Sequence, residues 1–231
     1  VGSEMCIRDS MMAMPNTLNN LPVLYSFRRC PFAIRARMSL AHCSIQVELR
    51  EVLLNEKPSA MLAASAKGSV PVLVLQDATI LDESLDIMRW AINRSYPGVN
   101  DPRNWLIVDE PVLAERLINI NDTAFKTALD GYKYGRLGYE KSPKEYRTDA
   151  ELFLGQLEAL LEQNSFLLGD KVSLADVAIF PFIRQFAGVD QSWFYETDYR
   201  KLQHWLTVFL QSELFTQTML KHAVWKEKTM F

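Results

Sequence analysis

One stretch of the chain decides the fold: Leu21-Pro-Val-Leu-Tyr-Ser-Phe-Arg-Arg-Cys-Pro-Phe-Ala-Ile-Arg-Ala-Arg-Met38. Its apolar run, Val23 to Tyr25, predicts a short buried strand. Pro31 suits the first turn of a helix, because the N–H that proline lacks would have no partner there. Cys30 should therefore lie where the strand turns into the helix.

A cysteine at a helix start is in a favourable place for a reactive thiolate. Free backbone N–H groups and the positive end of the helix dipole stabilise negative charge there. Arg28, Arg29 and Arg35 should add positive charge around Cys30. We predict a reactive cysteine; the alternative is a small buried hydrophobe at the end of a strand.

The bulk composition narrows the class of protein. The chain has 231 residues, 48% of them hydrophobic and 23% charged, which is typical of one large or two ordinary globular domains. The net charge of -3 argues against nucleic acid or an anionic membrane as a partner. No apolar run approaches the roughly 20 residues of a membrane span. Three unclustered cysteines and three scattered histidines predict a cytoplasmic protein with no disulfide framework and no metal site.

The first residues differ from the rest. Val1 to Ser10 shows neither periodicity nor the apolar core of a signal peptide, and it resembles translated sequencing adaptor. We expect residues 1–13 to be a non-native or disordered leader, with the natural start at Met11, Met12 or Met14.

Residues 20–95 should form an α/β domain in the order β-α-β-α-β-β-α. After the Pro31 helix, alternating residues 45–52 predict a strand, 59–65 a short helix, 70–75 and 79–81 a hairpin, and 84–94 an amphipathic helix. Residues 96–104 are rich in turn formers and predict a linker.

Residues 105–231 should form a domain made only of helices. Glu110-Pro111 is typical of a helix start, and Thr148 to Glu151 has the spacing of a capping box. The clearest start is Val172-Ser-Leu-Ala-Asp-Val177, where Ser173 and Asp176 can cap each other and Val172 can pack on Val177. That helix should run to about Ala187, with a kink at Pro181. Two further helices are predicted over 198–210 and 212–222.

This combination of a cysteine-led α/β domain and a helical domain resembles the glutathione transferase superfamily, whose first domain is thioredoxin-like. The resemblance covers Leu21 to His222. Within it, Arg29-Cys-Pro-Phe-Ala33 is similar to the cysteine-type omega class and related bacterial members.

The resemblance implies a glutathione site. Cys30 matches the catalytic cysteine, with Phe32 beside it. Lys57 matches the lysine that contacts the glycine end of glutathione. Val70 and Pro71 match the valine and cis-proline that pair with its cysteinyl part, and Glu83 and Ser84 match the pair that holds its γ-glutamyl part. The alternatives are an ordinary surface lysine, a trans strand start, a solvated acid and a helix-capping serine.

Cys30 should act alone. Ala33 stands where a dithiol motif has its second cysteine, and Cys43 lies about 20 Å further along the predicted helix. A disulfide needs Cα atoms within about 7 Å. The resemblance then implies a monothiol glutathione-dependent thiol transferase or reductase, acting on small mixed disulfides or on oxidised ascorbate.

Two other functions stay open at this point. One is conjugation of glutathione to electrophiles, and the other is a non-catalytic regulatory role like that of the bacterial stringent-starvation relatives. The family habit implies a homodimer. For the acceptor wall we name aromatic candidates, whose alternative role is core or interface packing: Phe125, Tyr132, Tyr134, Trp193 and Phe194.

Overall fold

The computed structural model describes residues 21–97, 103–106, 108–135 and 140–227. The predicted leader and residues 98–102 of the predicted linker lie outside the described residues. The first half of the chain has the predicted order, and its elements are β1 (Val23–Ser26), α1 (Pro31–His42), β2 (Glu48–Glu51), α2 (Ser59–Ala64), β3 (Val72–Val74), β4 (Ile80–Leu81) and α3 (Ser84–Ser95). This confirms the thioredoxin-like fold class.

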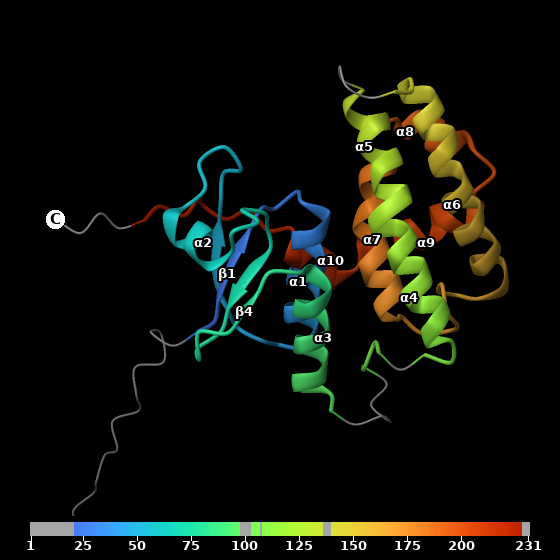
Figure 1. The fold of residues 1–231 in the computed structure, drawn as a ribbon. Helices are drawn as coiled ribbons and strands as arrows, with labels where there is room; N and C mark the ends of the chain where they lie inside the picture. Colours follow the sequence, from blue (N-terminus) through green and yellow to red (C-terminus); the bar gives the residue numbers. More distant parts are fainter. Residues whose placement is uncertain (1–20, 98–102, 107, 136–139, 228–231) are drawn as a thin grey trace, which may run out of the picture.

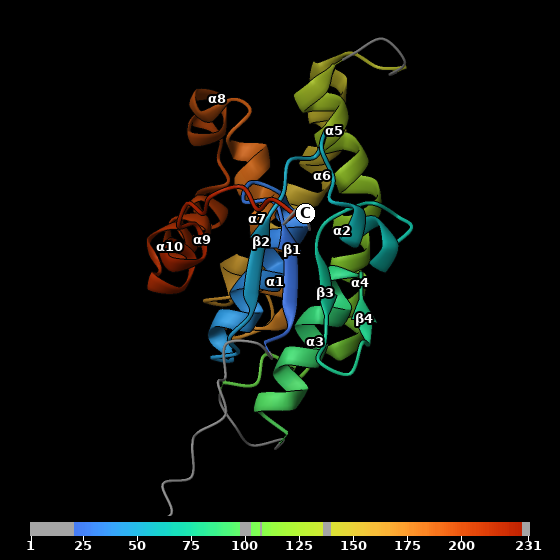
Figure 2. The same ribbon diagram turned by 90° about the vertical axis from the view of Figure 1, so that its left-hand side faces the viewer.

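The four strands form one mixed sheet in the order β2-β1-β3-β4 (Figure 2). β1 runs parallel to β2 and antiparallel to β3, which pairs antiparallel with β4. Alternate residues of a strand face opposite sides of a sheet. Leu24, paired with Leu73, therefore faces the large core with α1 and α3, whereas Tyr25, paired with Val72, faces the smaller core that includes Met61 of α2.

α1 lies at the centre of the molecule. α1 and α3 lie between the sheet and the helices of the second half, and α2 lies on the other side of the sheet (Figure 1). α1 contacts α3 on its own side and α7 and α10 across the boundary. Because apolar neighbours surround it, Ile34 and Met38 are fully buried, and so is the charged Arg35.

The described part of the second half contains only helices: α4 (Pro111–Ile120), the π-helical turn η2 (Asn121–Phe125), α5 (Lys126–Tyr134), α6 (Pro143–Gln163), α7 (Leu174–Ala187), α8 (Gln191–Glu196), α9 (Arg200–Gln211) and α10 (Glu213–Thr218). The sequence did not predict η2 or α8. The last predicted helix is shorter than expected, because α10 ends at Thr218.

The capping box predicted at Thr148 to Glu151 is wrong, because these residues lie inside α6. α6 begins earlier, where Ser142 and Glu145 cap each other and Pro143 occupies the first helical position. Ser142 and Glu145 have the same spacing as Thr148 and Glu151, and they set the start of this helix together with Pro143.

The capping box predicted at the start of α7 is confirmed. Asp176 Oδ2 accepts from Ser173 N at 2.9 Å, and Ser173 Oγ accepts from Asp176 N at 3.4 Å. Asp176 Oδ1 also accepts from the Leu167 N–H and from Trp205 Nε1, each at 2.9 Å. This buried carboxylate therefore joins α7 to α9 and to the turn before α7.

The last described residues return to the first half of the chain. Val224 forms a parallel bridge with Glu51 at the end of β2, and Trp225 N donates to Glu51 O at 2.8 Å. Trp225 packs edge-on against Tyr25, with ring centroids 6.1 Å apart. Glu227 accepts from Ser59 Oγ at 2.8 Å and from Ala60 N at 2.9 Å, at the start of α2.

Candidate functional site

Cys30 occupies the N-cap position of α1, as predicted, after a turn closed by a 3.0 Å bond from Cys30 N to Phe27 O. Its thiol points across to the loop before β3 and donates to Val70 O at 3.7 Å. The Val70–Pro71 peptide is cis, which excludes the alternative of a trans strand start. The structure thus brings together Cys30, Val70 and Pro71.

Burial raises the pKa of the Cys30 thiol above its ordinary value. The N–H groups of Ala33 and Phe32 lower this pKa, and the positive charges of Lys126 and Arg37 lower it further, but burial has the larger effect. The helix start therefore favours the thiolate, as predicted, but burial outweighs it, so that the net shift of the Cys30 pKa is upward. The reason is that burial depends on the tertiary surroundings, whereas the helix start is a local feature.

A cleft of about 460 Å³ opens beside Cys30 between the two halves of the molecule. Phe27, Phe32 and Leu54 line it from the first half. Lys126, Tyr134 and Gln185 are among the residues that line it from the helices of the second half. Phe32 also packs against Phe182 of α7, with ring centroids 4.9 Å apart, and this contact joins the cleft wall of the first half to the helices of the second half.

Among the aromatic candidates for the acceptor wall, only Tyr134 lines this cleft. Phe125 is 2% exposed and packs against Phe153 and Phe186. Tyr132 and Trp193 pack against Phe186 as well, and Phe194 is fully buried. These four side chains have the packing role that was their alternative.

Ser84 is the first residue of α3 and is 4% exposed. It does not cap the helix, because Glu83 holds the N-cap position. Its Oγ lies 3.5 Å from Nη1 of the buried Arg35. Glu83 is exposed and forms an ion pair with Lys67.

Lys57 is exposed and lies close to the loop that leads to Val70. A Cβ atom at Gly68 would lie 3.6 Å from Lys57 Nζ. Gly68 has φ +58°, a conformation that suits glycine. The tight turn thus lets the lysine approach the backbone two residues before Val70, and its role towards a ligand stays a prediction.

A buried ion pair that sequence reasoning missed supports this site. Arg35 donates to Asp122 through Nη2 at 2.5 Å and Nη1 at 2.9 Å, and through Nε to Ala178 O at 2.6 Å. Its guanidinium also stacks on the Phe182 ring, 4.4 Å from the centroid. Asp122 belongs to the π-helical turn η2, a feature frequent at functional sites. One bidentate pair thus joins α1, α7 and η2 next to Ser84.

The other described cysteine is remote from this site. Cys43 is buried at the C-cap of α1, at the far end from Cys30, and both thiols are free. Within the described ranges, no three histidine, cysteine, aspartate or glutamate side chains are grouped so that they could hold a metal ion. None of the helices described here is long and apolar enough to span a membrane.

Comparison with known families decides the affiliation. Residues 24–99 match the family model described as "Glutathione S-transferase, N-terminal domain", and residues 144–207 match "Glutathione S-transferase, C-terminal domain". The chain belongs to the glutathione S-transferase superfamily. It is accordingly an enzyme of glutathione transferase type, as the resemblance implied.

Curated relatives and solved structures agree with this placement. The chain is 22% identical over 240 residues to glutathione S-transferase DHAR3, chloroplastic, of Arabidopsis thaliana, covering 98% of this chain and 81% of that protein. It is 26% identical over 168 residues to mouse glutathione S-transferase omega-1, covering 72% of this chain and 68% of that protein. A Pseudomonas putida glutathione transferase, solved with one glutathione disulfide bound per subunit, has a TM-score of 0.72 at 17% identity, covering 89% of this chain and 93% of that one.

Proposed function

We propose that this protein is a glutathione-dependent thiol transferase of the cysteine type, with Cys30 as its only attacking thiol. The observation that carries the proposal is the position of the Cys30 sulfur, which lies against the Val70 carbonyl and lines the cleft. The names of the relatives, an omega-class transferase among them, support the same reading. The proposal includes a cytoplasmic location and a homodimer.

Glutathione would bind along the loop before β3. Its cysteinyl part would pair with the Val70 backbone beside Pro71, its glycine carboxylate with Lys57, and its γ-glutamyl carboxylate with Ser84 at the start of α3. The amine of the γ-glutamyl part would bind the Glu83 carboxylate in place of Lys67, with which Glu83 forms an ion pair.

Glutathione binding would also activate the thiol. The Cys30 thiol now donates to Val70 O, the carbonyl that a glutathione N–H would use. When the ligand takes this acceptor, the protonated thiol loses its partner, whereas the Ala33 and Phe32 N–H groups still stabilise the thiolate. The raised pKa of Cys30 should therefore fall when glutathione binds.

Glutathione is the only reductant that the proposed thiol–disulfide exchange needs. The Cys30 thiolate attacks the glutathione sulfur of a mixed disulfide, forms a new S–S bond and expels the other thiol as a thiolate, which takes a proton from solvent. A second glutathione thiolate then attacks the Cys30 adduct, which releases glutathione disulfide and the Cys30 thiolate. Oxidised ascorbate, reduced by two electrons from two glutathione molecules, is a further acceptor within this proposal.

The test compares Cys30→Ser with Cys43→Ala in the reduction of the glutathione–mercaptoethanol mixed disulfide. We expect Cys30→Ser to fall to the rate of the uncatalysed exchange and Cys43→Ala to keep the wild-type rate. Glutathione disulfide should leave a glutathione on Cys30 of the wild type, seen by mass spectrometry of the peptide that contains this residue, and none at residue 30 of the Ser variant. An active Cys30→Ser variant would refute the mechanism, and faster conjugation of an aryl halide than disulfide reduction would favour the conjugation alternative.

A further inference from the structure

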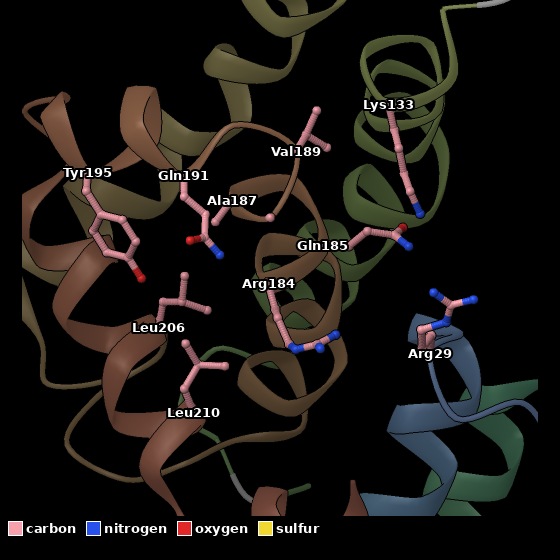
Figure 3. Close-up of a pocket in the computed structure, with 11 residues that line it drawn as sticks. Arg29, Lys133, Arg184, Gln185, Ala187, Val189, Gln191, Tyr195, Leu206 and Leu210 are labelled. Atoms are coloured by element: carbon pink, nitrogen blue, oxygen red, sulfur yellow. The ribbon is translucent and has the colours of Figure 1, made fainter. Parts of the chain in front are cut away.

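A second pocket, of about 650 Å³, adjoins the cleft of Cys30. Arg29, Lys133 and Gln185 line both, so the two cavities meet around these three side chains. Arg184 lines only the second, which we call the Arg184 pocket. Figure 3 shows the Arg184 guanidinium extending from α7 towards Arg29, and the Lys133 side chain descending from α5 towards the same opening.

The Arg184 pocket is positively charged at one side and apolar at the other. Arg29 and Lys133 stand at its junction with the cleft, Arg184 extends towards Arg29, and Leu206 and Leu210 of α9 lie on the other side of Arg184 (Figure 3). No carboxylate is present among the described residues that line it. This is a notable imbalance in a chain whose net charge is -3.

The three cations have no anionic partner among the described carboxylates. Each cation lies near an aromatic ring: the Phe27 ring centroid is 5.6 Å from Arg29, that of Tyr134 is 4.8 Å from Lys133, and that of Phe215 is 5.4 Å from Arg184. Lys126, in the neighbouring cleft, is by contrast paired with Asp130.

The surroundings of Arg184 destabilise the charged form of its guanidinium. Burial lowers the pKa of its guanidinium, and the positive charge of Arg28 lowers it further. A bound anion would offset both effects, because an opposite charge favours the ionised form.

We propose that the Arg184 pocket binds the non-glutathione half of the substrate, and that this half is a thiol with an apolar or aromatic body and a carboxylate. The proposal rests on the proposed function, since it assigns the substrate class of the same exchange. The glutathione sulfur would face Cys30, the apolar body of the other half would extend from it into the pocket, and the carboxylate would approach Arg184, with Leu206 and Leu210 on the wall beyond.

The charges have a specific consequence in the exchange reaction. When Cys30 bonds to the glutathione sulfur, the departing thiolate and its carboxylate leave past Arg29 and Lys133. Charge-assisted hydrogen bonds to a carboxylate are stronger than neutral ones. The enzyme should therefore prefer a leaving thiol that carries a carboxylate to an uncharged one of the same shape. Three cations on an acidic chain are too few for a nucleic-acid surface.

The experiment uses two mixed disulfides of glutathione, one with 4-(mercaptomethyl)benzoate and one with the matching benzamide. They differ in charge, and the methylene group keeps their thiol pKa values close. We expect the wild type to prefer the benzoate by about tenfold in kcat/KM. In Arg184→Gln the preference should fall to about one. Arg116→Gln, which removes one charge from α4, should keep the wild-type ratio.

The ratio separates substrate recognition from damage to folding or to Cys30, because both substrates undergo the same chemistry. A wild-type ratio near one, or an equal loss in Arg184→Gln and Arg116→Gln, would overturn the proposal. If neither substrate turns over, the proposed function fails but the pocket is still testable. Calorimetric titration of 4-(methylthiomethyl)benzoate should then show binding that Arg184→Gln weakens about tenfold, and binding equal to that of the amide would overturn the site.

Discussion

Asp122→Ala should be among the most destabilising single changes in this protein, because of what it leaves behind. The Arg35 side chain is 0% exposed and Asp122 is 23% exposed. Asp122 supplies both acceptors of the bidentate pair. Without it, the remaining partners of the guanidinium are the uncharged Ala178 carbonyl and Ser84 hydroxyl. A buried positive charge would have lost its counter-charge.

The size of the effect follows from the burial of the pair. Removing one partner of a buried pair costs about 3–5 kcal/mol of unfolding free energy. The partial exposure of Asp122 lets water reach the vacated site, so we expect about 3 kcal/mol, the lower end of that range. For a chain of this length the melting temperature should fall by about 6–12 °C.

Urea denaturation followed by tryptophan fluorescence measures this loss. The matched control is Asp149→Ala, which breaks the 2.6 Å pair with Lys141 on the surface, where both side chains are more than 40% exposed. Its effect should be a small fraction of that of Asp122→Ala, because exposed pairs contribute little. The double variant Arg35→Met/Asp122→Ala should be more stable than Asp122→Ala alone, since no charge is then left in the core.

Two results would refute this reasoning. The first is an Asp122→Ala urea midpoint no lower than that of Asp149→Ala, which would mean that water or a rearranged side chain satisfies Arg35. The second is a double variant less stable than Asp122→Ala, which would mean that Arg35 contributes through its bond to Ala178 and its packing more than its isolated charge costs.

Three further predictions concern other parts of the structure. Because burial raises the pKa of Cys30, the rate of its alkylation by iodoacetamide should keep rising as the pH passes the ordinary pKa of a thiol. Lys126→Met should slow this alkylation at pH 7, since the positive charge of Lys126 lowers the pKa of Cys30, and equal rates in the two proteins would contradict that role. Asp176→Ala leaves three buried N–H donors unpaired, those of Leu167, Ser173 and Trp205, and should cost about 3 kcal/mol, seen as a lower urea midpoint than that of the surface control Asp170→Ala. Trp225→Ala should cost about 1–2 kcal/mol through lost packing on Tyr25, and an unchanged midpoint would show that the contact contributes nothing.

Local patterns in the sequence accounted for most of the elements. The alternation along residues 45–52 and the apolar run at 70–75 predicted β2 and β3, with bounds a few residues too wide. Ser173 and Asp176 predicted the start of α7 because a capping box is made within four residues. The same pattern misled at Thr148, where Ser142 and Pro143 had already begun the helix.

Features that depend on distant residues were out of reach. Arg35 and Asp122 are 87 positions apart, and no local pattern relates an arginine on an apolar helix face to that acid. The position of Cys30 at the start of α1 could be predicted, but the net direction of its pKa shift could not. The helix start is local, whereas the burial that outweighs it comes from the whole fold.

The return of Val224, Trp225 and Glu227 to the first half of the chain has a consequence for biosynthesis. These residues complete the outer edge of β2 and the start of α2, yet they follow all of the described helices in the order of translation. Domains generally fold as units from the N-terminus while the ribosome is still working. The edge of the first domain therefore stays uncovered until the second domain has been synthesised. A ribosome that stalls in α9 would leave the nascent first domain without these contacts.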